Sequence, residues 1–167
     1  MAEEIPAADL IRSCPAQPST ELVTKFVDFS SKYGLGYKLS TGAFGVLFND
    51  STKIVTVSPD LFWFCYIERV KTDANTQATE TINYYNFYEY PAAINKKVVL
   101  LQHFKSYLEG NSKFKALTFD YPRDQIPARP AHCQEGVLPA YIKKWKRAKK
   151  AILLRNSNKV IQVIFQD

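Results

Sequence analysis

The sequence lacks several features that would indicate a membrane, secreted or metal-binding protein. No apolar run in its 167 residues approaches the roughly 18 that a transmembrane helix needs. The N-terminus carries acidic residues where a secretory signal peptide requires positive charge. The three cysteines are odd in number, widely separated and outside any CxxC pair, and neither histidine stands at a ligand-like spacing to them. We therefore expect an intracellular protein with no disulfide framework, no metal and no cofactor.

Catalytic signatures are missing as well. The sequence contains no glycine-rich phosphate loop, no HRD or DFG motif and no GxSxG elbow. The adjacent carboxylates Glu3 and Glu4 lie in a polar, proline-containing segment that is typical of a flexible arm, where we expect them to be solvated. The chain is thus predicted to have no catalytic residues.

Acidic residues are scarce at the C-terminal end, although the net charge of the whole chain is only +6. Residues 1–139 hold fourteen basic and fifteen acidic side chains, a balance of −1. Residues 140–167 hold eight basic and one acidic side chain, a balance of +7. An anionic partner is therefore expected to meet the C-terminal segment.

Short apolar runs separated by turn signals predict an antiparallel sheet. Residues 35–39 and 44–48 flank Ser40-Thr41-Gly42, a pattern typical of a hairpin, because aromatic and β-branched residues favour strands and glycine tolerates the turn. Residues 22–29 form a short apolar approach to this hairpin. Three further strands are expected at residues 53–57, 61–69 and 82–88, with a polar loop at 71–80.

The apolar period then changes from that of a strand to that of a helix. Between residues 91 and 108, apolar side chains recur at steps of 4, 3, 3 and 4, which predicts an amphipathic helix that begins near Pro91 and ends at Gly110. A proline-rich linker should follow, and a second hairpin is expected from 151–155 and 159–166. The predicted fold class is α+β, a sheet of five or six antiparallel strands crossed by one helix. The helix-stripe residues are Ile94, Val98, Leu101, Phe104 and Leu108.

The first hairpin also resembles a known family. The stretches KFVDFSSKYGLGYKL and GVLFNDSTK resemble the opening of a polo box, the non-catalytic C-terminal module of polo-like kinases, and KKVVLLQHFKSYL is similar to the helix of that family. Residues 139–167 resemble the start of a second polo box. The resemblance implies a flexible arm at 1–21, a first polo box at 22–110, a linker at 111–139 and an incomplete second box at 140–167.

The resemblance implies binding of peptides that contain phosphoserine or phosphothreonine. In the family, such a peptide lies between two boxes, pairs with the first strand-like segment and stacks on a tryptophan. Phe26 takes the place of that tryptophan here, with Val27 and Asp28 beside it on the peptide-pairing edge. Arg147 and Phe165 fall at positions that line the groove from the second box. The His-x-Lys pair that holds the phosphate in the family would follow directly after Asp167.

This reading predicts a module that docks a polo-like Ser/Thr kinase onto phosphorylated partners at centrosomes, basal bodies or kinetochores, in the cytoplasm or the nucleus. Two alternatives remain. Open strand edges of an incomplete second box would favour a homodimeric scaffold. The basic residues between 143 and 150, interleaved with aromatic ones, would suit nucleic acid or an anionic membrane. Phe26 and Val27 also fit core positions, as do Trp63 and Trp145.

Overall fold

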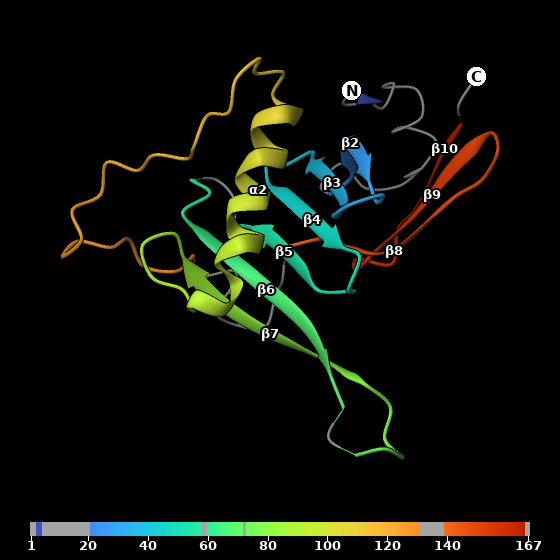
Figure 1. Ribbon diagram of the computed structural model, residues 1–167, viewed down its shortest axis with the longest axis horizontal. Coiled ribbons are helices and arrows are strands. Elements are labelled where there is room, and N and C mark those ends of the chain that lie inside the picture. Colours follow the sequence, from blue (N-terminus) through green and yellow to red (C-terminus); the bar gives the residue numbers. More distant parts are fainter. Residues whose placement is uncertain (1–2, 5–20, 58–59, 72, 131–138, 166–167) are drawn as a thin grey trace.

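The protein is described here from a computed structural model (Figure 1), which describes residues 3–4, 21–57, 60–71, 73–130 and 139–165. Seven antiparallel strands form one sheet in the order β1-β2-β3-β4-β5-β6-β7, and three more form a second sheet in the order β10-β9-β8. The strands of the first sheet are β1 (Glu3–Glu4), β2 (Val23–Phe29), β3 (Gly34–Leu39), β4 (Phe44–Phe48), β5 (Lys53–Thr56), β6 (Trp63–Val70) and β7 (Thr79–Asn86). The remaining elements are the 3-10 turn η1 (Ala92–Ile94), the helix α2 (Asn95–Leu108) and the strands β8 (Ile142–Arg147), β9 (Ala151–Asn156) and β10 (Ile161–Phe165).

The middle strands of the large sheet, β3 to β5, are buried on both faces, which explains why they are rich in apolar residues. Side chains alternate along a strand, so neighbouring residues enter different cores. On β2, Phe26 enters a core shared with the three-stranded sheet, whereas Val27 enters a core shared with α2. The same alternation separates Val55 from Ile54 on β5. The first sheet is therefore the middle of three layers.

The helix crosses the sheet where glycine lets it approach closely (Figure 1). A Cβ atom at Gly36 of β3 would lie 2.3 Å from the ring of Phe104, so the Phe104 ring occupies the space that a side chain would need. Val98, Leu101 and Leu108 complete the buried stripe of α2. The amphipathic helix predicted from the sequence is confirmed, and with it the α+β fold class.

The strand count differs from the prediction. Residues 23–29 form a full strand rather than a short approach, and Glu3–Glu4 adds a seventh strand where five or six were expected. The basic segment before the second hairpin is also a strand, β8, although only its first residue is fully apolar and buried. The linker residues 111–130 contain no helix or strand, and they lie against the first sheet through Trp63, whose indole N–H donates to the carbonyl of Pro127 at 2.9 Å.

The described residues include one of the three cysteines. Cys65 is a free, buried thiol, whereas Cys14 and Cys133 lie outside the described residues. Within the described ranges, no three His, Cys, Asp or Glu residues are grouped so that they could hold a metal ion. In the same part of the chain, no helix combines the length and the apolar character needed to cross a bilayer.

Tyr37 joins the two sheets through its hydroxyl group. The side chain is fully buried, and its oxygen accepts a hydrogen bond from the backbone N–H of Ile142 at 3.1 Å. Replacing Tyr37 with phenylalanine would leave that buried N–H without a partner, so we expect the free energy of unfolding to fall by about 1–3 kcal/mol. Urea unfolding should show this loss, and Tyr107→Phe, at a side chain that is 42% exposed, should change stability little. Equal losses in the two variants would contradict the proposed link.

Candidate functional site

The candidate site lies where the two sheets meet at β2. The side chain of Gln162 on β10 accepts a hydrogen bond from the N–H of Val23 at 2.8 Å and donates one to the carbonyl of Val23 at 3.1 Å. Asn156 of β9 donates to the same Gln162 oxygen at 3.0 Å. These buried contacts hold the start of β2 against the last strand of the chain. They therefore fix the position of the β8 side chains relative to β2.

Arg147 and Asp28, two of the five predicted site residues, are in direct contact. The Arg147 guanidinium donates to Asp28 Oδ2 at 2.7 Å, and it lies 3.5 Å from the carboxylate of Glu3. Asp28 Oδ1 accepts hydrogen bonds from the hydroxyl and the N–H of Ser30. Burial alone would raise the pKa of Asp28, but the bonds from Ser30 and Arg147 outweigh it and hold the pKa below its usual value. Asp28 is therefore a stable anion that orients Arg147.

Phe26 and Val27 contribute backbone rather than side chains to the surface. Their side chains are only 1% and 4% exposed, so the Phe26 ring is a core residue and is not available on the surface for stacking. The outer edge of β2 carries β1, which pairs antiparallel with Glu3 opposite Phe26 and Glu4 opposite Lys25. Glu3 is not merely solvated, because it pairs with Arg147, whereas Glu4 is exposed, as expected for a solvated carboxylate, and lies 3.8 Å from Lys25.

Phe165, the fifth predicted residue, ends β10 and is 69% exposed. Alternation along β10 buries Gln162 and Ile164 and exposes the side chains between them. Within the described residues, the structure records no ring contact between Phe165 and another aromatic side chain. Phe165 is thus part of an exposed apolar face of the three-stranded sheet, whose other members are Leu153, Ile161 and Val163.

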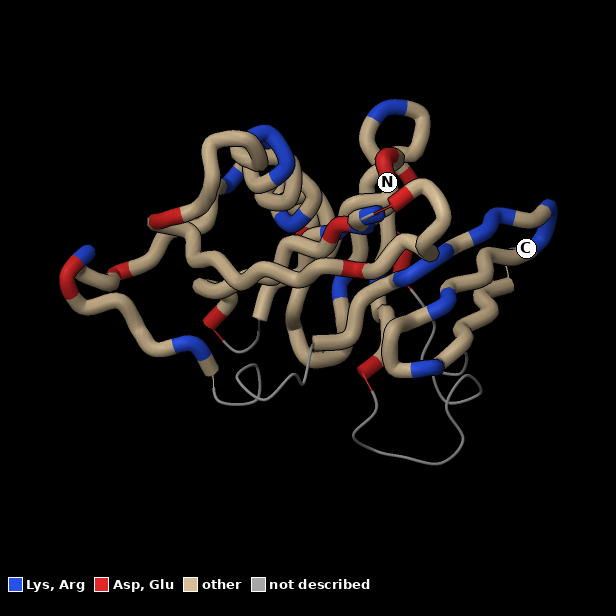
Figure 2. The backbone as a smooth tube through the Cα atoms, turned by 90° about the horizontal axis from the view of Figure 1, so that it is seen from below, with Lys and Arg blue, Asp and Glu red and all other residues tan. Residues whose placement is uncertain are grey.

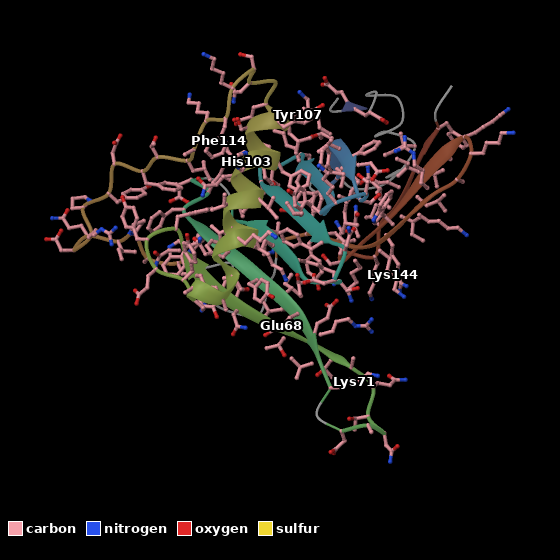
Figure 3. All side chains as sticks on the ribbon, viewed as in Figure 1. Glu68, Lys71, His103, Tyr107, Phe114 and Lys144 are labelled. Atoms are coloured by element: carbon pink, nitrogen blue, oxygen red, sulfur yellow. The ribbon has the colours of Figure 1, made fainter. Side chains whose placement is uncertain are left out.

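A hollow beside α2 was not predicted from the sequence. It has a volume of about 350 Å³ and is lined by Val27, Tyr33 and residues of the helix, among them His103 and Tyr107. Figure 3 shows His103 and Tyr107 on the helix with Phe114 close by, and the His103 and Phe114 rings stack with centroids 3.9 Å apart. The helical period identified the stripe that faces the core, and Leu100 and Tyr107, which broaden that stripe in the sequence, line the hollow.

The basic C-terminal segment does not form one patch. Figure 2 shows Lys and Arg along the three-stranded sheet, and the contacts separate them into groups. Arg147 faces Asp28 and Glu3, whereas Lys143 and Lys144, nearer the start of β8, line a cavity. Lys149 and Lys150 are exposed at the β8–β9 turn. Arg147 therefore has carboxylate neighbours, whereas Lys149 and Lys150 are open to solvent.

Comparison with known proteins places the chain in a family. Residues 31–98 match the family model described as the POLO box duplicated region. The chain is 44% identical over 145 residues to the probable serine/threonine-protein kinase CCRP1 of Zea mays, a match that covers 87% of this chain and 21% of that protein. It is 36% identical over 156 residues to the serine/threonine-protein kinase PLK1 of Xenopus tropicalis, covering 92% of this chain and 23% of the relative. The chain thus spans about a fifth of the length of these relatives.

Solved structures show the same fold. The budding yeast Cdc5 polo-box domain in complex with an Spc72 phosphopeptide has a TM-score of 0.63 at 23% identity, covering 95% of this chain and 54% of that one. The Cdc5 domain in complex with the Dbf4 polo-interacting region has the same TM-score at 22% identity, covering 96% and 57%. The resemblance stated from the sequence is confirmed, and the part shared with the kinases is their polo-box region rather than their kinase domain. The chain therefore belongs to the polo-box family of the polo-like kinases.

Proposed function

We propose that this chain is a non-catalytic module that binds phosphoserine- or phosphothreonine-containing peptides and so docks a polo-like Ser/Thr kinase onto phosphorylated partners at centrosomes, basal bodies or kinetochores. The observation that carries the proposal is the 2.7 Å contact between Arg147 and Asp28. It brings a cation from β8 to the outer edge of β2, two elements whose contacting residues are 119 positions apart in sequence.

This pairing of a cation with a strand edge suits an extended phosphopeptide. The edge of β2 offers backbone N–H and C=O groups to a peptide strand, and Phe26, Val27 and Asp28 mark the segment involved. A guanidinium forms charge-assisted, often bidentate hydrogen bonds to phosphate, which are stronger than bonds between neutral groups. Arg147 would supply the preference for phosphate, and Phe165 would contribute apolar contact at the end of β10.

The carboxylates already present do not rule out this use of Arg147. Its side chain is 41% exposed, and Asp28 and Glu3 each carry one negative charge, whereas a phosphate carries more negative charge and three acceptor oxygens. A phosphopeptide strand would replace β1 on the edge and the Glu3 carboxylate beside Arg147. In this proposal the functional parts are a first box at 22–110, a linker at 111–139 and the start of a second box at 140–167, preceded by an arm at 1–21.

The related structures are consistent with this proposal. The Cdc5 polo-box domain, by its description, has been observed with an Spc72 phosphopeptide. Phosphopeptide binding is a property of Cdc5. The 23% sequence identity between Cdc5 and this chain supports a shared fold alone. For this chain the argument is therefore its own geometry, namely the pairing of β2 with a short acidic strand and the cation beside it.

Fluorescence polarisation tests the proposal directly. A peptide containing Ser-phosphothreonine should bind the chain at least about tenfold more tightly than its unphosphorylated twin, about 1.4 kcal/mol. A third peptide with glutamate in place of phosphothreonine separates charge from phosphate geometry, and it should bind more weakly than the phosphorylated one. Equal binding of the phosphorylated and unphosphorylated peptides would contradict the proposal. A dimer mass in light scattering would then favour the scaffold alternative, through the exposed apolar face of Leu153, Ile161, Val163 and Phe165.

A further inference from the structure

A second concave site lies beside Lys143, Lys144 and Trp145 of β8, whereas Arg147 ends that strand and does not line it. The cavity has a volume of about 420 Å³. Its walls are the turn after β4 at Asn49–Ser51, the ends of β6 and β7, and the strands β8 and β9. Figure 3 shows Lys144 on the side of the molecule where the β6–β7 hairpin projects, with Glu68 and Lys71 placed along that hairpin.

The cavity is strongly cationic. Five basic side chains line it, Lys53, Arg69, Lys143, Lys144 and Arg155, against one carboxylate, that of Glu80. Glu80 is already engaged, because Lys53 donates to it at 3.2 Å and Tyr141 at 2.6 Å. Within the described residues, Arg69, Lys144 and Arg155 lie within 4.0 Å of no acidic group. The site therefore holds an excess of positive charge that has no partner within the described part of the chain.

Glu80 is held as an anion by its neighbours in the cavity. Burial raises its pKa, but the hydrogen bond from Tyr141 and the charge of Lys53 outweigh burial and hold the pKa of Glu80 below its usual value. The Lys53 side chain is itself only 3% exposed. The Lys53–Glu80 pair is the less exposed part of the cavity lining, and Arg69, Lys144 and Arg155 are exposed.

β8 offers a strand edge beside this charge. It is the outer strand of the order β10-β9-β8, and within the described residues no strand pairs with its other side. An extended peptide can add to such an edge through backbone hydrogen bonds. The three cations without an acidic partner, Arg69, Lys144 and Arg155, come from three separate strands. They therefore fit several separate negative charges better than a single phosphate.

The edge strand β8 of the three-stranded sheet shares two features with β2 of the first sheet. Both β2 and β8 have a register shift after their first residue, and their fourth residues are aromatic, Phe26 and Trp145. β2 lies against β10 through Gln162, and β8 lies against β4. β2 therefore lies beside the last strand of the three-stranded sheet, whereas β8 lies beside a middle strand of the first sheet.

From this geometry we infer that the cavity beside β8 is a second peptide-binding site, which takes an extended acidic segment rich in Asp or Glu from a partner protein. The backbone of the partner segment adds to the edge of β8, and its carboxylates meet Arg69, Lys144 and Arg155. The site uses other cations than Arg147, so it does not depend on phosphopeptide binding at β2.

A labelled peptide of alternating Glu and Thr tests this site, because alternation places all of its carboxylates on one face of an extended strand. Fluorescence polarisation with the full chain at about 150 mM salt should show saturable binding, since close charge pairs persist under that screening. The charge-reversing double variant Lys144→Glu/Arg155→Glu should lose at least about tenfold in affinity. Lys149→Glu/Lys150→Glu, with the same change in net charge at the β8–β9 turn, should lose less than about threefold.

Several results would overturn the inference. These are a wild-type chain that does not bind the peptide, a Gln–Thr peptide that binds as well as the Glu–Thr peptide, and equal losses in the two double variants. Tighter binding of a single-stranded oligonucleotide, abolished by the same Lys144→Glu/Arg155→Glu change, would assign the cavity to nucleic acid instead. Loss of the thermal unfolding transition would show that charge reversal unfolds the chain. In that case the alanine double variants K144A/R155A and K149A/K150A are compared instead.

The site can be separated from phosphopeptide binding in the same experiment. Lys144→Glu/Arg155→Glu should leave the preference for phosphothreonine unchanged, and Arg147→Glu should leave binding of the Glu–Thr peptide within about threefold of wild type. Loss of both activities in either variant would show one shared site and would overturn the inference of a second one.

Discussion

Replacing Gly34 with alanine is expected to lower the free energy of unfolding by about 3 kcal/mol or more. Gly34 begins β3 with φ at +152°, and a Cβ atom there would lie 2.1 Å from the carbonyl oxygen of Leu47 on β4. That oxygen belongs to the backbone of a strand paired on both sides, so it cannot rotate away as a side chain could. β3 and β4 would have to separate in the middle of the sheet.

Urea unfolding of Gly34→Ala beside Gly42→Ala measures this effect. Gly42 also has a positive φ, +91°, but a Cβ atom at Gly42 would meet no other atom within 4 Å. Gly42→Ala therefore introduces backbone strain without a steric clash. It should lower the free energy of unfolding by about 1 kcal/mol. Similar losses in the two variants would show that conformation, rather than the contact with Leu47, makes glycine necessary at position 34.

Arg147→Glu is expected to weaken phosphothreonine peptide binding by at least about tenfold. A hydrogen bond to a charged group contributes about 1.5–3 kcal/mol, and a glutamate at position 147 would add a third carboxylate beside Asp28 and Glu3. Fluorescence polarisation with the phosphorylated and unphosphorylated twins measures both affinity and preference. Only the phosphorylated peptide should lose affinity, because the unphosphorylated one makes no charge-assisted bond to Arg147.

Lys150→Glu is the matched control for this change. It alters the net charge equally, and it lies at the exposed β8–β9 turn, so peptide affinity should fall by less than about threefold. Equal losses in the two variants would mean that the peptide responds to the overall charge of the domain. An Arg147→Glu variant with unchanged affinity would remove Arg147 from the binding site.

The sequence predicts the interior of this fold better than its edges. Strands β3 to β7 are bounded by turn residues and carry apolar side chains for two cores, so their periods are easily recognised. β8 carries lysine and arginine at four of its six positions, since one of its sides is an open edge, and propensity alone gives little sign of a strand. β1 is two residues long and is defined only by its pairing with β2.

The candidate site, which lies at strand edges, was likewise harder to predict from the sequence than the core. No spacing in the sequence indicates that Arg147 meets Asp28 across 119 positions, and it was the resemblance to the polo box that placed them in one groove. The burial of Phe26 agrees with the core position that its sequence context also allowed, because an aromatic residue in an apolar run more often packs than binds. The cavity beside β8 depends on residues from the six strands β4 to β9 and the turn after β4, and only the folded chain brings these together.

The short strand β1 has a consequence for the behaviour of the chain in solution. An unpaired edge strand is a template for adding a second copy of the same protein, which leads to aggregation. β1 covers only part of the edge of β2 and is held by ion pairs that are exposed to water, so it contributes little to stability. It is nevertheless enough to shield the edge against chance pairing while giving way to a longer strand with more hydrogen bonds. Because salt screens such ion pairs, colloidal stability should be greatest at low ionic strength.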